Sequence, residues 1–133
     1  MQMFPPIQED PSSEQQLYDR GPMLASLSNA IVGVYKRRYG KGPTKARSYV
    51  MDDIVCCVLR GGLTQAELTL ASSGRADSVT RQRHELQEAV RDEFVRVVEE
   101  IVGRPVVAFL STTSTDPDVS VEIFMLEPEM RAS

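Results

Sequence analysis

The sequence has no acidic residue between Arg20 and Met51, although it holds seven Lys or Arg there. This segment therefore has a formal charge of +7, while the rest of the chain has −11, which gives the net charge of −4. Six of the seven cations lie between Lys36 and Arg47. Such segregation predicts a local surface that attracts an anionic partner on an otherwise acidic protein.

Long apolar runs are also missing. The longest strictly apolar run, Ile54 to Leu59, is far shorter than the about 20 residues of a membrane-spanning helix. The N-terminal residues lack the basic start, apolar stretch and small-residue cleavage site of a secretory signal. We therefore expect a cytoplasmic protein, with peripheral contact at the inner face of the membrane as the one form of membrane association open to it.

Cysteine is scarce. Cys56 and Cys57 are the two cysteines of the chain and are adjacent within the apolar run. Neighbouring side chains of a strand point to opposite faces, and a disulfide between neighbours is strained. We expect two buried, reduced thiols, and the absence of a second cysteine pair excludes a four-thiolate zinc site.

The sequence also lacks an obvious catalytic residue set. His84 is the one histidine and lies off the apolar stripe of its predicted helix, so we expect it in solvent. Ser111, His84 and Asp116 make a Ser-His-Asp set on paper, but no nucleophile elbow marks the serine. Asp116 and Asp118 fit turn chemistry about as well as a hard-cation site. We predict a protein that is not an enzyme, with no catalytic residue, cofactor or metal.

Size and composition favour one domain. The chain has 133 residues with 41% apolar content, enough for one modest core. Residues 1–22 are rich in Pro, Gln, Ser and acids, and such segments bury too little apolar surface to offset the entropy of ordering. The prediction is a flexible tail over 1–22, a domain over 23–127 and a short tail over 128–133.

Hydrophobic periodicity and turn signals give seven elements in the order α-β-β-α-α-β-β. Thr64 and Glu67 have the spacing of a capping box, and Asp77 or Ser78 can cap the helix that follows. This order predicts an α+β fold, a two-layer sandwich of a four-stranded, mainly antiparallel sheet and three helices. The predicted helices span 23–39, 64–74 and about 77–102, and the predicted strands span 45–51, 54–59, 106–110 and 119–126.

The basic cluster is the candidate binding site. The glycines around Lys41 do not form a nucleotide-binding loop, because they follow a helix and Pro43 removes a backbone donor. Cations at the end of a helix also offset its dipole, so a purely structural role stays open for them. The candidate site comprises Lys36, Arg37, Arg38, Lys41, Thr44, Lys45 and Arg47.

The segments LSNAIVGVYKRRYGKGPTKARSYVMDDIVCCVLRGGLTQAE and FLSTTSTDPDVSVEIFML resemble the MpsC-type family of small bacterial and archaeal proteins. The likeness covers about residues 24–127 and is most specific at 28–32, 40–47, 63–67 and 116–118. The family takes its name from a sodium-translocating, membrane-potential-generating system linked to inorganic-carbon uptake. The resemblance implies an accessory role beside a transporter and supplies no catalytic residues. The paired cysteines and the longer N-terminal tail depart from the family pattern.

Three hypotheses follow. The leading one is a soluble, homodimeric accessory or regulatory protein that docks through the basic cluster onto a protein partner, such as a membrane transporter subunit. The first alternative is a single-stranded nucleic-acid module that stacks bases on Tyr35, Tyr39 and Tyr49, but a pI near 5.0 disfavours it. The second alternative is a sensor of a small anion, bicarbonate or a carboxylate, held by Lys41, Thr44 and Arg47.

Overall fold

The computed structural model describes residues 11–129 of the chain, with side chains described from residue 20 onward. The first half contains α1 (Pro11–Tyr39), β1 (Lys45–Met51), β2 (Ile54–Arg60) and α2 (Gln65–Leu70). A π-helical turn, η1 (Ala71–Arg75), joins α2 to α3 (Ala76–Ala89). The chain then forms α4 (Arg91–Val102), β3 (Val106–Thr115) and β4 (Asp118–Leu126).

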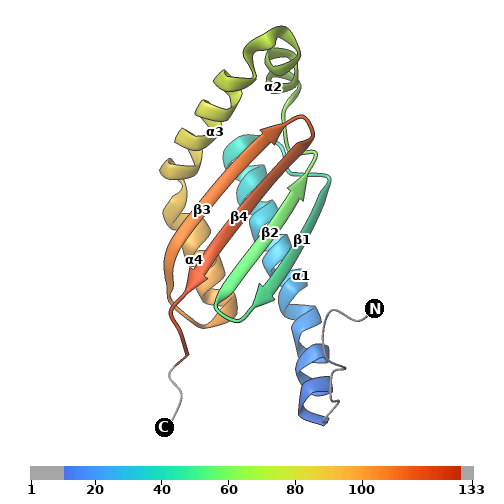
Figure 1. Ribbon diagram of the computed structural model, residues 1–133, viewed down its shortest axis with the longest axis vertical. Helices are drawn as coiled ribbons and strands as arrows, with labels where there is room; N and C mark the ends of the chain where they lie inside the picture. The colour runs from blue at the N-terminus through green and yellow to red at the C-terminus, as the bar shows by residue number, and fades with distance from the viewer. Residues whose placement is uncertain (1–10, 130–133) are drawn as a thin grey trace, which may run out of the picture.

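The four strands form one antiparallel sheet in the order β1-β2-β4-β3. Figure 1 shows α1 and α4 behind one face of this sheet, with α2 and α3 reaching beyond its upper end. The opposite face carries no helix in this view. The predicted α+β class and element order are confirmed, with α2, η1 and α3 taken as one bent helical segment.

The core lies between the sheet and the helices. α1 contributes Leu27, Ile31 and Val34, and α4 contributes Phe94 and Val98, all fully buried. The strands contribute the inward-facing side chains Val55, Cys57, Leu59, Phe109, Phe124 and Leu126. Each such side chain stabilises the fold by about 1.5–3 kcal/mol relative to exposure, so this apolar layer holds the sheet against α1 and α4.

The first helix is longer than predicted. We expected it to begin at residue 23, because Pro22 suits the first turn of a helix. In the structure Pro22 lies inside α1, which begins at Pro11. The predicted start of the helix was wrong because residues 14–16 are polar yet good helix formers, so polarity alone did not indicate where the helix begins. Residues 1–10 and 130–133, which the tail predictions include, lie outside the described residues.

The first hairpin and the start of α2 are as predicted. β1 and β2 pair through residues 45–51 and 54–60 on either side of the Asp52–Asp53 turn. Thr64 caps α2: its hydroxyl accepts a hydrogen bond from the Glu67 amide at 3.2 Å, and the Glu67 carboxylate accepts one from the Thr64 amide at 2.8 Å. This capping box fixes where the chain leaves the sheet to enter the helical layer.

The predicted long helix is divided in two. α3 ends at Ala89 and α4 begins at Arg91, because Val90 has non-helical dihedral angles (φ −106°, ψ 12°). The caps predicted at Asp77 or Ser78 were wrong, since the left-handed Gly74 (φ 79°) lets the chain re-enter a helix at Ala76. Within residues 11–129, no helix combines the length and the apolar character that crossing a membrane requires.

Candidate functional site

The last turn of α1 carries three of the predicted site residues, Lys36, Arg37 and Arg38, which we call the helix group. The Arg37 and Arg38 side chains are 57% and 54% exposed, and each forms a 2.8 Å ion pair with Glu93 of α4. Hydrogen bonds from these two arginines hold the pKa of Glu93 below its usual value. The helix group thus faces solvent on the helical layer, with one carboxylate bound between two of its cations.

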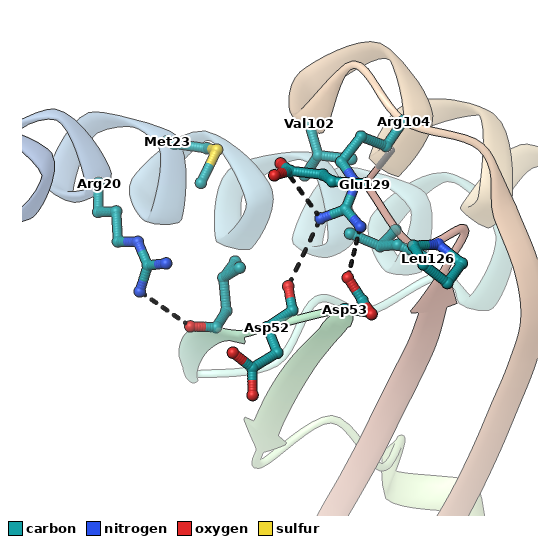
Figure 2. Close-up of a pocket in the computed structure, with 10 residues that line it drawn as sticks. Arg20, Met23, Asp52, Asp53, Val102, Arg104, Leu126 and Glu129 are labelled. Atoms are coloured by element: carbon teal, nitrogen blue, oxygen red, sulfur yellow. Dashed lines mark hydrogen bonds and ion pairs between the residues drawn. The ribbon is translucent and has the colours of Figure 1, made fainter. Parts of the chain in front are cut away.

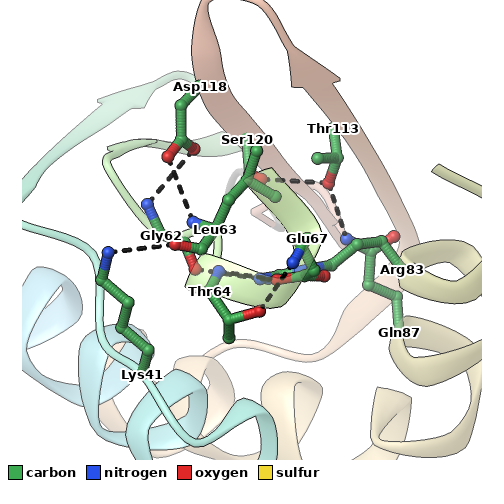
Figure 3. Close-up of polar contacts among 10 residues, drawn as sticks. All are labelled: Lys41, Gly62, Leu63, Thr64, Glu67, Arg83, Gln87, Thr113, Asp118 and Ser120. Carbon is green, nitrogen blue, oxygen red and sulfur yellow. Dashed lines mark hydrogen bonds and ion pairs between the residues drawn. The ribbon is translucent and has the colours of Figure 1, made fainter. Parts of the chain in front are cut away.

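The turn after α1 uses its polar side chains internally. Lys41 donates a hydrogen bond from Nζ to the carbonyl oxygen of Leu63 at 3.0 Å (Figure 3). The Thr44 hydroxyl donates to the carbonyl oxygen of Arg60 at 3.2 Å. Lys41 and Thr44 therefore tie the turn to the end of β2 and to the loop before α2.

Lys45 and Arg47 lie on the other side of the molecule. They alternate with the inward-facing Ser48 along β1 and are exposed on the face of the sheet that no helix covers. Arg60 of β2 pairs in register with Lys45, and these residues line one shallow groove with Tyr49. We call Lys45, Arg47 and Arg60 the sheet group. Arg60 was missed because the predicted strand ended one residue before it.

The structure therefore does not bring the predicted site together as one patch. The helix group lies on the helical layer, the sheet group lies on the uncovered face, and Lys41 and Thr44 bind backbone carbonyls between them. The anion-sensor hypothesis required Lys41, Thr44 and Arg47 to converge, but Arg47 instead extends over the ring of Tyr49, 5.8 Å from its centroid.

The aromatic side chains argue against the nucleic-acid hypothesis. Tyr35 and Tyr39 are 1% and 9% exposed and stack on each other with their ring centroids 4.6 Å apart. They are core residues and cannot present their rings to bases. Of the three tyrosines in that hypothesis, Tyr49 alone is exposed, at 41%.

Sequence reasoning missed a set of buried ionisable residues under the sheet, Tyr35, Tyr39, Glu67, Arg83 and Glu122, which we call the buried polar cluster. Arg83 is 1% exposed. Its Nε donates to the Glu67 carboxylate at 2.7 Å, and Nη2 donates to the Gly62 carbonyl oxygen at 2.9 Å. Figure 3 shows Glu67, capped onto Thr64, in contact with Arg83. The Arg83 guanidinium also lies 4.6 Å from the centroid of the Tyr39 ring.

Arg83 and Glu67 favour each other's charged form. Burial by itself raises the pKa of Glu67, but hydrogen bonds from Arg83 and from the Thr64 backbone outweigh it, so the pKa is lowered. Burial by itself lowers the pKa of Arg83, and the Glu67 carboxylate more than reverses this. The pair is therefore charged when folded, and loss of one partner would leave the other charge buried.

Glu122 is the other ionisable centre of the cluster. It is 0% exposed and accepts a hydrogen bond from the Tyr35 hydroxyl. Burial raises the pKa of Glu122 to about 7, although the hydrogen bond from Tyr35 and the charge of Arg83 oppose the rise. Burial, with Glu122 nearby, also raises the pKa of Tyr35. A pKa near neutrality suits a general acid or base, but this carboxyl has no exposed surface on which to meet a substrate.

A hydrogen-bonded chain of neutral side chains adjoins the cluster. Gln87 of α3 donates from Nε2 to the Thr113 hydroxyl at 3.4 Å, and Thr113 is 3.0 Å from the Ser120 hydroxyl (Figure 3). These contacts join α3 to β3 and β4. One signal in the sequence pointed to this polar interior: Ser120 and Glu122 share the strand alternation of the buried Phe124.

The remaining candidate residues take structural positions. His84 is exposed, as expected, and lines a small pocket with Ser111, yet no hydrogen bond joins these two side chains in the described part of the chain. The Asp118 carboxylate accepts hydrogen bonds from the backbone amides of Gly62 and Leu63, both at 3.2 Å (Figure 3). Among residues 20–129, whose side chains the structure describes, no group of three or more His, Cys, Asp or Glu could hold a metal ion.

The two thiols differ in environment. Both are free, Cys57 is buried and burial raises its pKa to about 12. Cys56 lies only partly buried on the uncovered face of the sheet, so the prediction of two buried thiols was wrong for it.

A hollow at the other end of the molecule is lined by residues of both charges. Figure 2 shows Arg104 reaching Asp53 and Glu129, and Arg20 reaching the carbonyl oxygen of Val50. The Arg104–Asp53 ion pair measures 2.6 Å, and Arg104 Nη2 also donates to the Glu127 carbonyl oxygen at 2.6 Å. These contacts fasten the β1–β2 turn to the end of β4.

Comparison with known proteins identifies one family. The family model described as "Na+-translocating membrane potential-generating system (MpsC)" matches residues 19–128. No curated protein and no solved structure matches the chain. The matched range includes both cation groups and the buried polar cluster.

Proposed function

Since the chain belongs to the MpsC family, we propose that it is a cytoplasmic, non-catalytic accessory component of a Na+-translocating, membrane-potential-generating system, docking onto an anionic surface of that system. The observation that carries the proposal is the family match, which spans residues 19–128 of this 133-residue chain. The burial of Glu122 supports a non-catalytic role, because this carboxyl, whose pKa is raised to about 7, is 0% exposed and cannot meet a substrate.

The helix group is the docking element in this proposal. Its two arginines keep more than half of their side-chain surface exposed although both contact Glu93. Three cations at about 1 kcal/mol each near an anionic surface contribute at most about 3 kcal/mol, which is less than even a millimolar affinity requires. The group therefore speeds and orients association, and other contacts supply most of the affinity.

The test measures the function of the whole system. In cells that carry the system but lack this chain, we expect a smaller Na+-dependent membrane potential, read with a potential-sensitive dye, and full recovery with the wild-type chain. The triple variant K36Q/R37Q/R38Q should recover the potential only in part, and its deficit relative to the wild type should shrink as the ionic strength rises, because salt screens the charges that the wild type keeps.

The matched control is R75Q/R81Q/R96Q, which removes three exposed cations from the helices that follow β2 and should recover the potential fully. A potential unchanged by loss of the chain would contradict the accessory role. Equal recovery by the two triple variants would contradict docking through the helix group, without contradicting the accessory role.

A further inference from the structure

The uncovered face of the sheet is unusually apolar. Alternate residues of all four strands point away from the helices, and eleven of them are apolar: Tyr49, Met51, Ile54, Cys56, Val58, Ala108, Leu110, Val119, Val121, Ile123 and Met125. We call this surface the open face. Tyr49, Met51 and Leu110 are 41%, 58% and 56% exposed. Monomeric proteins rarely leave so continuous an apolar surface in water.

The strand register orders the open face into four levels along the strands. The middle level consists of Tyr49, Cys56, Ile123 and Leu110, one from each strand. On the side of the β1–β2 turn lies a level of Met51, Ile54, Met125 and Ala108, followed by Asp52 and Asp53 of the turn itself. On the other side lie Arg47, Val58, Val121 and Thr112, and then Lys45, Arg60, Val119 and Ser114.

The size of the open face reaches the lower limit for a specific interface. Four strands spaced about 4.8 Å apart and four levels spaced about 6.8 Å apart give a flat footprint of about 500 Å². Two such faces in contact remove at least about 1,000 Å² from water, the lower limit for specific association. Their edges are the strands β1 and β3.

We infer that the open face binds the open face of a second copy of this chain, forming a two-fold symmetric dimer with sheet packed on sheet. The two-fold axis runs across the strands at the middle level. This dimer goes beyond the proposed accessory function and does not depend on it, since the helix group lies on the helical layer.

The pattern of levels is self-complementary under this axis. The middle level of one copy lies on the middle level of the second copy, so that Cys56 lies opposite Cys56 of the second copy. The apolar level of Met51 lies on the level of Val121 in the second copy, which places Arg47 over Met51. Beyond them, Lys45 meets Asp52 of the second copy, because both belong to the β1 side of the sheet.

The charges favour this orientation over the alternative. A two-fold axis along the strands would leave both sheet groups at the same end of the interface, because β1 would then lie on β3 and β2 on β4, and no carboxylate would face a cation. The axis across the strands instead places Lys45 and Arg60 of the sheet group over the acidic turn of the second copy. The Asp52 carboxylate takes part in no ion pair among residues 20–129, whereas Asp53 is bound to Arg104, so Asp52 is the acceptor for Lys45.

Sedimentation and light scattering of the full chain test the dimer. At micromolar concentration we expect a particle of twice the chain mass of 14.8 kDa. Y49E/L110E should weaken dimerisation at least about tenfold, with an unchanged far-UV circular dichroism spectrum because both side chains are exposed on edge strands. The control L68E/L70E alters two exposed leucines of α2 and should remain dimeric.

Charge exchange tests the orientation. K45E and D52K should each weaken the dimer, and the double variant K45E/D52K should restore it. Alkylation of the Cys56 thiol should slow as the protein concentration rises, while the C56S variant should show no fast-reacting thiol, because Cys57 is buried.

Several outcomes would overturn the inference. One is a wild-type chain that is monomeric at all concentrations. The same holds if the Cys56 thiol of this monomer is protected from alkylation only when membranes of the transport system are added. Another is a folded Y49E/L110E variant that stays dimeric, since the contact would then lie elsewhere. Failure of the double charge variant to recover would overturn the assigned axis.

Discussion

At the scale of single residues, Glu122 illustrates how strand alternation can place a carboxyl group in the core. It shares the inward face of β4 with Phe124 and Leu126 and is 0% exposed. The Tyr35 hydroxyl provides its hydrogen bond from α1. This contact joins the first helix to the last strand, so the sequence separation hides it from any local pattern.

The raised pKa of Glu122 predicts a specific pH dependence of stability. Below its ordinary pKa of 4.5 the group is protonated in both the folded and the unfolded chain. Between pH 4.5 and about 7 the unfolded chain has lost this proton while the folded chain keeps it. The free energy of unfolding therefore falls as the pH rises through this window, by up to about 3 kcal/mol from this one group.

We expect the variant E122Q to lack this fall, because its amide does not titrate. Urea denaturation of the wild type and of E122Q from pH 4 to pH 8 measures the difference in their free energies of unfolding. The free energy of unfolding of E122Q should increase relative to that of the wild type as the pH rises from 4.5 to 7. The control E88Q removes an exposed carboxyl of α3, and a shift of equal size in both variants would contradict the role of burial.

At the scale of elements, two glycines with positive φ mark the ends of secondary structure. Gly61 (φ 72°) follows β2, and Gly74 (φ 79°) separates α2 from α3. They differ in surroundings: a Cβ atom at Gly61 would lie 2.3 Å from the Thr44 hydroxyl oxygen, whereas nothing lies within 4 Å of a Cβ atom at Gly74. Thr44 cannot move freely, since it is hydrogen-bonded to the Arg60 carbonyl oxygen.

This difference predicts unequal costs for the same substitution. G74A should lower the free energy of unfolding by about 1–2 kcal/mol, the cost of left-handed backbone for a residue with a Cβ atom. G61A should add a steric clash in a packed turn, for a total of about 2–5 kcal/mol. Urea denaturation of both variants measures the two losses. Equal losses would show that Thr44 rearranges without cost.

At the scale of the whole molecule, the dimer predicts that thermal stability depends on protein concentration. Association with a second folded copy stabilises the native state by mass action. For two chains of this length, raising the concentration from 1 to 100 µM should raise Tm by about 5 °C. Differential scanning calorimetry measures this rise. Y49E/L110E should show a Tm independent of concentration, and a wild-type Tm that does not move would contradict the dimer.

Local rules predicted most elements because their causes are local. The capping box at Thr64 depends on residues three positions apart, and the β1–β2 hairpin depends on one two-residue turn. The left-handed Gly103 that ends α4 is likewise a local property of glycine. The break at Val90 was not predicted, because the apolar stripe continues through it without a glycine or proline.

For the candidate site, the sequence predicted which residues are cationic but not how they are arranged in space. The sequence identified the cations from Lys36 to Arg47, but the structure separates the helix group from the sheet group. Arg83 and Glu67 are 16 residues apart, and Tyr35 and Glu122 are 87 residues apart. Their pairing follows from packing α1 and α3 against the sheet, which no single segment encodes.

The amino-acid sequence by itself determined the α+β class, the order of the strands and helices, and the concentration of positive charge in one segment, because hydrophobic period, turn residues and formal charge are local quantities. Only the tertiary structure decided which cations share a face, which carboxyl groups are buried, and that one side of the sheet remains uncovered. Those properties depend on the distances and solvent exposure of residues far apart in the chain, which exist only once the sheet and the helices have packed together.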